Sequence, residues 1–145
     1  MSTGVTTVVE QLYAAWKSRD LQGVLALVAD DIVYALHIPA EVMPLGGETK
    51  GKTALALALQ GLLDNYDYLT YNPGPVSVDG AKASAEVHFR YREKATGEVI
   101  DSRLRHLWLV EAGKAKRLDE WHDLPKVTAF FDRVALRVAS GGARS

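Results

Sequence analysis

The segment RLDEWHD, residues 117–123, carries the side chains best suited to chemistry. Successive residues of a strand point to opposite faces, so Glu120 and His122 would share one face with Leu118. Three charged residues flank Trp121 on the other face, which we therefore expect to be wetter. A buried carboxylate without a cation nearby has a raised pKa, which suits a general acid or base, whereas with Arg105 beside it the carboxylate would stay ionised. The pattern predicts that Glu120 moves a proton, with His122 either as a proton shuttle or as a hydrogen-bonded residue at the rim.

The octet GGETKGKT, residues 46–53, matches the G-x-x-x-x-G-K-[ST] pattern of phosphate-binding loops. Such a loop requires a parallel sheet and a buried strand that runs directly into the first glycine. Here Pro44 lies two residues before Gly46, and a central strand would not tolerate it. The later strands are linked as hairpins and are therefore antiparallel. We interpret the octet as a glycine-rich loop that leads into a helix, with Lys50 and Lys52 exposed to solvent.

Hydrophobic periodicity divides the chain into helices followed by hairpin-linked strands. Helices are predicted over residues 5–18, 21–30, 52–66 and 127–138, with Asp20 as the N-cap of the second. Strands are predicted over residues 32–38, 68–73, 83–92, 99–110 and 114–123. This order predicts an α+β fold, in which a curved antiparallel (mixed) sheet wraps around the N-terminal helices. We expect one domain over residues 1–138 and a flexible tail over 139–145.

The composition excludes several classes of function. A chain of 145 residues with a net charge of −1 has no basic surplus for nucleic acid, and no apolar run is long enough to cross a membrane. It has no cysteine, and hence no disulfide or thiolate nucleophile. The four histidines lack metal-ligand spacing, so neither a metal nor a cofactor is predicted. The N-terminus lacks a signal pattern, which favours a cytoplasmic protein.

Three segments are similar to those of a known superfamily: VVEQLYAAWKSRDLQGVLALVADDIVY (8–34), GETKGKTAL (47–55) and RHLWLVEAGKAKRLDEWHDL (105–124). The chain resembles the nuclear transport factor 2-like superfamily, and within it the SnoaL-like polyketide cyclases, ketosteroid isomerases and limonene epoxide hydrolases. The resemblance implies a cone-shaped α+β barrel whose internal pocket holds a small hydrophobic, polyketide- or terpenoid-like molecule. It also accounts for the octet without a nucleotide.

The resemblance transfers only part of the catalytic residues. The positions of the isomerase tyrosine and its two carboxylates hold Leu12, Leu36 and Arg105, so ketosteroid isomerisation is not expected. Of the hydrolase residues, the tyrosine matches Tyr34 and the lone acid matches Glu120. The remaining hydrolase positions hold Leu36, Val87 and Phe89. One acid in an apolar pocket is therefore what the resemblance implies.

The strand over residues 99–110 allows two orientations. One face carries Arg103, Arg105, Leu107 and Leu109, and the other carries Leu104, His106, Trp108 and Val110. Periodicity alone would bury the second set, whereas the family register turns Arg105 into the pocket. We follow the register, which leaves Leu104 and Trp108 with Trp121 on an outer apolar patch. Because many relatives dimerise through that face, we expect a homodimer. The residues predicted at its interface are His88, Leu104, His106, Trp108 and Trp121.

These considerations lead to one hypothesis and one alternative. The predicted catalytic residues are Glu120, Arg105, His122 and Tyr34. The predicted pocket residues are Leu12, Tyr13, Trp16, Leu36, Val87, Phe89, Arg103, Leu107 and Leu118. Glu120 would move the proton and Arg105 would stabilise an oxyanion in an isomerisation, cyclisation, elimination or hydrolysis, although the two could also form a simple cross-strand pair. The alternative is a non-catalytic ligand-binding or dimerisation domain of the same fold.

Overall fold

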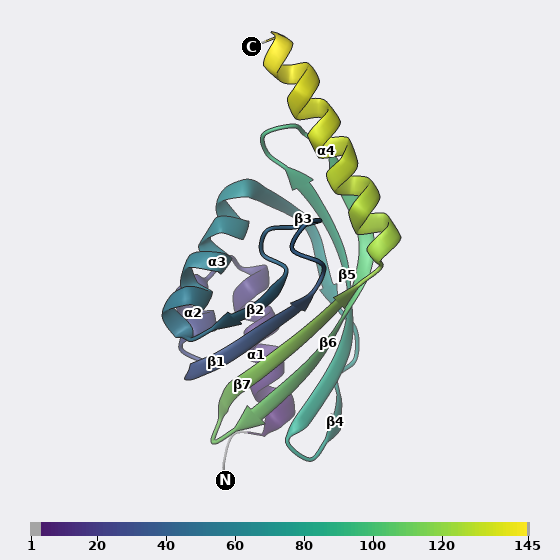
Figure 1. Ribbon diagram of the computed structural model, residues 1–145. Coiled ribbons are helices and arrows are strands. Elements are labelled where there is room, and N and C mark those ends of the chain that lie inside the picture. The colour runs from purple at the N-terminus through teal and green to yellow at the C-terminus, as the bar shows by residue number, and fades with distance from the viewer. Residues whose placement is uncertain (1–3, 145) are drawn as a thin grey trace.

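The computed structural model describes residues 4–144, which form a strongly curved sheet with helices against its concave side (Figure 1). The helices in this range are α1 (Val5–Lys17), α2 (Leu21–Leu25), α3 (Lys52–Asn65) and α4 (Leu124–Arg144). The strands are β1 (Val28–His37), β2 (Gly47–Lys50), β3 (Tyr66–Pro73), β4 (Ser77–Asp79), β5 (Lys82–Glu93), β6 (Val99–Glu111) and β7 (Lys114–His122). The predicted α+β class is confirmed.

The sheet is mixed, with the order β2-β1-β7-β6-β5-β3, and β4 pairs with β5. Gly97 and Gly113 have φ angles of 79° and 74°, so they adopt the left-handed conformation that the turns after β5 and β6 require. These turns make β5, β6 and β7 antiparallel neighbours. Strand β1 then pairs with β7 in parallel, with Leu36 opposite Glu120. This parallel contact places an N-terminal strand beside the C-terminal strand that carries the candidate acid.

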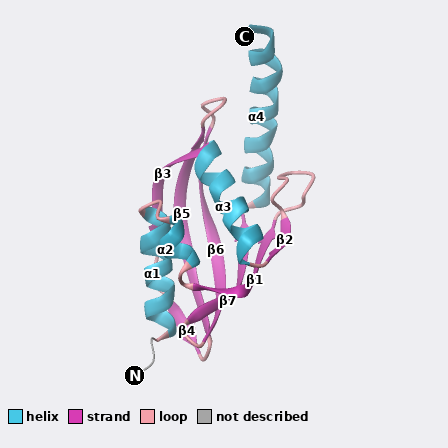
Figure 2. Ribbon diagram, turned by 90° about the vertical axis from the view of Figure 1, so that its left-hand side faces the viewer, coloured by secondary structure: helices cyan, strands magenta, loops and turns pink. Residues whose placement is uncertain are grey.

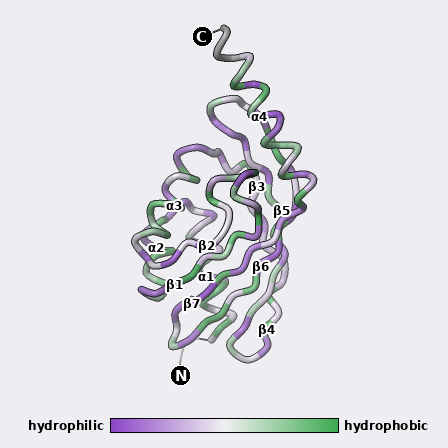
Figure 3. The backbone as a smooth tube through the Cα atoms, in the orientation of Figure 1, coloured by the Kyte–Doolittle hydropathy of each residue, from purple (hydrophilic) through white to green (hydrophobic). Residues whose placement is uncertain are grey.

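Helices α1, α2 and α3 lie on the same side of the sheet (Figure 2). The inner face of α1 buries Val8, Val9, Leu12 and Tyr13. Val8 and Val9 are fully buried, and burial of such a side chain contributes about 1.5–3 kcal/mol. Hydrophobic and hydrophilic residues alternate along β5, whereas β7 is mostly hydrophilic (Figure 3). Apolar side chains from both layers therefore meet on the concave side.

Two expectations about the elements are wrong. The second helix, predicted over residues 21–30, ends at Leu25, and the chain is extended from Val28 onward. Asp20 nevertheless caps it, because its Oδ1 accepts a hydrogen bond from the Gly23 amide at 2.9 Å. The octet contains the short strand β2, which pairs with β1 at the edge of the sheet. β2 was missed because four residues between glycines carry too little periodicity.

Helix α4 is longer than expected. The segment predicted as a tail, residues 139–145, is helical through Arg144, and residue 145 lies outside the described residues, as do residues 1–3 of the predicted domain. Val127 and Phe130 bury the first turns of α4 against the domain. The later turns project away from it (Figure 1), and Leu136 is 69% exposed there. No helix of the described residues is long and apolar enough to cross a membrane.

Candidate functional site

A cavity lies on the concave side of the sheet, bounded by α1, α3 and the start of α4. Its volume, taken as the space open to the centres of water molecules, is about 130 Å³. One water needs about 10–15 Å³ on that measure, so the space suits an organic molecule rather than a single water. The wall is mostly hydrocarbon, and its polar members are Glu120, His106, His122, the six tyrosines and the indole nitrogens of two tryptophans.

Three polar side chains converge on the carboxylate of Glu120 at one wall of this cavity. Nε2 of His106 lies 2.8 Å from Oε1, and Nε2 of His122 lies 2.6 Å from Oε2. The Tyr34 hydroxyl donates to Oε1 at 3.1 Å. The side chain of Glu120 is only 12% exposed. Since a carboxylate can only accept hydrogen bonds, each imidazole must present an N–H to it.

The hydrogen bonds decide the protonation state of Glu120. Burial alone would raise the pKa of its carboxyl, but the bonds from His106 and His122 outweigh burial and hold the pKa well below its ordinary value. Glu120 is therefore an anion near neutral pH. The raised pKa expected without a nearby cation is not found. The carboxylate is ionised, as expected beside a cation, but the groups that hold it so are His106 and His122 and not Arg105.

The tyrosines around the cavity are held in their neutral form. Burial is the largest cause of a raised pKa at Tyr34, and the charge of Glu120 adds to it. Burial likewise raises the pKa of Tyr68, Tyr71 and Tyr91. Their hydroxyls therefore remain hydrogen-bond donors at any physiological pH. Tyr68 and Tyr91 stack with ring centroids 4.1 Å apart, which gives the cavity a flat aromatic wall.

A second chain of hydrogen bonds leads away from Glu120 through His106. Nδ1 of His106 lies 2.8 Å from the Tyr13 hydroxyl, and that hydroxyl accepts a bond from Nε1 of Trp108 at 3.0 Å. The rings of Tyr13 and His106 stack at 5.6 Å. This arrangement ties α1 to the sheet with polar contacts inside an apolar core.

His122 differs from His106 in having one free ring nitrogen. Within residues 4–144, its Nδ1 is buried and has no hydrogen-bond partner. The His122 side chain is 8% exposed and lines the cavity. Its ring meets Phe89 edge-on at 5.5 Å. A buried polar atom without a partner is costly, so this nitrogen marks where a ligand can gain a hydrogen bond.

The structure brings together three of the four predicted catalytic residues. Tyr34, Glu120 and His122 meet at the cavity wall, as the resemblance and the alternation along 117–123 predicted. Arg105 does not join them. It is exposed on the outer face of the sheet, where its guanidinium carbon lies 5.7 Å from the centroid of the Trp121 ring.

Arg105 lies on the outer face because of the register of β6 against β7. His106 is paired with Glu120, whereas Arg105 is paired with Trp121. Because one residue of register exchanges the two faces, the inward set is Leu104, His106, Trp108 and Val110, all of them buried. The periodicity was therefore right, and the register taken from the resemblance was wrong. Trp108 and His106 could have been found by trusting the alternation.

The predicted pocket residues also fall on both faces of the sheet. Those that line the cavity are Leu12, Tyr13, Trp16, Leu36, Phe89 and Leu118. Val87 is fully buried but belongs to the core beside the cavity. Arg103 points outward and bonds Glu86 at 3.1 Å, and Leu107 lies on that outer face as well. Sequence reasoning also missed Tyr66, Tyr68, Tyr71 and Tyr91, although strand alternation singles out Tyr91.

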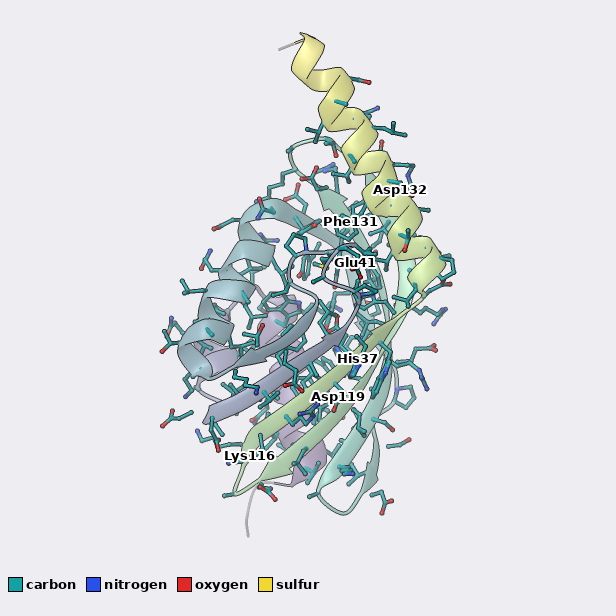
Figure 4. All side chains as sticks on the ribbon, viewed as in Figure 1. His37, Glu41, Lys116, Asp119, Phe131 and Asp132 are labelled. Atoms are coloured by element: carbon teal, nitrogen blue, oxygen red, sulfur yellow. The ribbon has the colours of Figure 1, made fainter. Side chains whose placement is uncertain are left out.

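The outer face has a different composition from the one expected for a dimer interface. Leu104, His106 and Trp108 point inward, so only His88 and Trp121 of the predicted patch remain outside. The ring of Trp121 stacks on His37 with centroids 4.7 Å apart. His37 and Asp119 lie on the neighbouring strands β1 and β7, 2.9 Å apart (Figure 4). This face is a network of charged groups rather than an apolar patch, and dimerisation stays a prediction.

Among the described residues, no three His, Asp or Glu side chains are arranged to hold a metal ion. The carboxylate and two imidazoles of the cluster instead bond one another directly. The chemistry available at this site is therefore that of a histidine oriented by an anionic carboxylate, inside an apolar cavity with neutral phenol donors.

A curved mixed sheet that encloses a cavity with three helices is the architecture of the nuclear transport factor 2-like superfamily, and solved structures of that class superpose on this chain. A protein of this class from Burkholderia pseudomallei is 20% identical, with a TM-score of 0.79, over 89% of this chain and 98% of its own. A Pseudomonas putida protein described as a candidate polyketide cyclase is also 20% identical, with a TM-score of 0.73, over 88% and 98%.

TerC, crystallised with polyporic acid, is 17% identical with a TM-score of 0.74, over 88% of this chain and 98% of its own. At such identities the likeness concerns the fold. The chain belongs to the family of SnoaL-like domains, which matches residues 9–118. No curated protein matches it.

Proposed function

We propose that the protein binds a small hydrophobic, polyketide- or terpenoid-like molecule in the cavity and transfers a proton with His122, which Glu120 orients. The apolar wall favours a molecule that is mainly hydrocarbon or aromatic. Membership of the SnoaL-like family and the fold shared with the Pseudomonas putida protein agree with such a ligand. The reaction classes open to one base in this setting are isomerisation, cyclisation, elimination and hydrolysis.

The free Nδ1 of His122 is the observation that carries this proposal. When Nε2–H donates to Glu120, a neutral imidazole keeps its lone pair on Nδ1, which no described group occupies. The anionic carboxylate then stabilises the imidazolium that forms when Nδ1 takes a proton. A base placed in this way contributes roughly 10²–10⁴-fold to a proton transfer.

Glu120 acts differently from the role first predicted for it. Its oxygens accept three hydrogen bonds and its pKa is lowered, so it is a weak base. We assign it the orientation and charge stabilisation of His122. Arg105 cannot stabilise an oxyanion from the outer face, and the described cavity wall contains no Lys or Arg. The neutral hydroxyls of Tyr68 and Tyr71 are the donors available for that task.

The test begins with a thermal-shift screen of neutral cyclic ketones and phenols, because no substrate is assumed. Each compound that binds is then held with the protein in deuterated water, and exchange of its acidic protons is followed by nuclear magnetic resonance. In Glu120→Gln the amide oxygen takes the place of Oε1, which accepts from Tyr34 and His106, so the amide N–H₂ faces Nε2 of His122. Nε2 must then accept, and the imidazole hydrogen moves to Nδ1, which can no longer take a proton. Exchange should fall by about 10²–10⁴-fold while the Kd changes by less than about threefold.

Asp119→Asn is the matched control. This carboxylate is the sequence neighbour of Glu120, but it faces outward and bonds His37 and Arg117. Exchange should be unchanged in this variant. A Glu120→Gln protein that exchanges at the wild-type rate would remove the proposed role of the pair.

The second candidate function is ligand binding without catalysis. It is favoured by the position of Arg105 on the outer face, since the cation expected to assist chemistry is absent from the described cavity wall. The same experiment separates the two, because a binding protein would retain the compounds of the screen without exchanging their protons in the wild type.

A further inference from the structure

The hydrogen bonds that link Trp108, Tyr13, His106 and Glu120 have a direction, which follows from their donors. The indole Nε1–H of Trp108 can only donate, so the Tyr13 oxygen accepts from it at 3.0 Å. The hydrogen of Tyr13 then requires an acceptor, and Nδ1 of His106 lies 2.8 Å away. Nε2 of His106 must therefore carry the hydrogen that it donates to Glu120 at 2.8 Å.

Only one protonation state of His106 satisfies all of these groups. In the opposite tautomer, the Nε2 lone pair would face the Glu120 carboxylate, and the Tyr13 oxygen would receive two donors. In the imidazolium, Nδ1–H would again point at the Tyr13 oxygen, whose own hydrogen would lose its acceptor. Tyr13 is 5% exposed and the His106 side chain 3%, so water cannot easily supply the missing partner.

We infer that Tyr13 and Trp108 are positioning residues that hold His106 in the neutral Nε2–H form, so that a proton entering the cluster resides on His122. This inference rests on the proposed function, because it names what makes His122 the single proton acceptor. Trp108 fixes the direction of the Tyr13 hydroxyl, and Tyr13 occupies Nδ1 of His106. The negative charge of Glu120 then stabilises the positive charge that His122 acquires with the proton.

The titratable groups around His106 agree with a neutral His106 and a proton on His122. Glu120 of β7 faces its Nε2 and Tyr13 of α1 faces its Nδ1, while Trp108 of the same strand lies edge-on at 5.4 Å. Tyr34 of β1 reaches the cluster only through Glu120. The two histidines thus bond the same carboxylate, but of the two only His122 keeps a ring nitrogen without a hydrogen-bond partner.

The test uses the ligand-free protein labelled with ¹⁵N, in which long-range proton–nitrogen spectra distinguish protonated from unprotonated ring nitrogens. Wild-type His106 should show a protonated Nε2 and an unprotonated Nδ1. In Tyr13→Phe, Nδ1 loses the donor that keeps it free of hydrogen. The fraction of His106 that carries hydrogen on Nδ1 should rise about tenfold, roughly the equilibrium change that one hydrogen bond supports.

Tyr71→Phe is the matched control, because Tyr71 also lines the cavity and its ring lies 6.3 Å from that of Tyr13. Its His106 signals should equal those of the wild type. For any compound that the wild type exchanges, Tyr13→Phe should slow exchange while binding stays within about threefold, as expected for a positioning residue.

Two results would overturn the inference. One is a wild-type His106 that carries hydrogen on Nδ1, which needs no variant and is unaffected if Tyr13→Phe fails to fold. The other is a folded Tyr13→Phe protein whose His106 signals match the wild type. If the His106 signals behave as expected but no compound is ever exchanged, the proposed function fails and the tautomer assignment stands.

Discussion

Raising the pH above about 10, the ordinary tyrosine pKa, should unfold this protein in one cooperative step that ionises its tyrosines. All six tyrosines line the cavity, and burial is the largest cause of a raised pKa at each. At Tyr66, burial raises the pKa to about 12. The folded protein therefore keeps protons that the unfolded chain releases.

The magnitude follows from proton linkage. A raised folded pKa gives stability that is complete below the unfolded pKa and is lost as the pH rises past it. Each tyrosine that stays protonated only in the folded state removes about 1.4 kcal/mol per pH unit above 10. Six such groups remove about 8 kcal/mol per unit. A domain with roughly 5–15 kcal/mol of stability would then unfold within about one to two units.

The assay follows tyrosinate absorbance and far-ultraviolet circular dichroism in the same sample, from about pH 8 to pH 12. Both signals should change together and steeply, and return to neutral pH should reverse them. Absorbance that rises gradually around pH 10 with unchanged circular dichroism would refute the argument, since it would mean that tyrosines ionise in the folded protein.

Two further predictions concern packing. Gly46→Ala should destabilise the fold, because a Cβ there would lie 2.0 Å from the Ile38 carbonyl oxygen. A Cβ at Gly61, inside helix α3, meets nothing within 4 Å, so Gly61→Ala should raise the free energy of unfolding by about 0.5–1 kcal/mol. Urea unfolding of both variants checks these opposite signs, and equal shifts would contradict them. Phe130→Ala should cost about 3–5 kcal/mol, because this side chain is 2% exposed at the cavity wall. Leu136→Ala, on the exposed part of α4, should change stability by less than about 0.5 kcal/mol. A loss in Phe130→Ala as small as that in Leu136→Ala would show that Phe130 is not buried as described.

Local patterns predicted the elements whose side chains repeat regularly. The alternation over residues 83–92 matches β5, and the faces predicted for Glu120 and His122 are those observed. Strands β2 and β4 and the early end of helix α2 escaped prediction. β2 is short, and residues 26–30 are apolar enough to suit either a helix or a strand.

For the orientation of β6, hydrophobic alternation and the resemblance to the family gave opposite predictions. Hydrophobic alternation placed His106 and Trp108 inside, and the register suggested by the resemblance placed Arg105 there. The structure follows the alternation, because burying Trp108 and Leu104 is favourable, whereas burying Arg105 beside Glu120 would remove a second charge from water at a cost of several kcal/mol.

The sequence by itself determined the α+β class, the inward face of residues 118–122 and the absence of cysteine chemistry. Only the tertiary structure decided which partners meet the acid. The Tyr13 hydroxyl and His106 are separated by 93 residues, and Tyr34 and Glu120 by 86. Such contacts depend on the parallel pairing of β1 with β7 and on the packing of α1 against the sheet. No local periodicity encodes them, because periodicity reports which face a side chain occupies and not which distant group faces it.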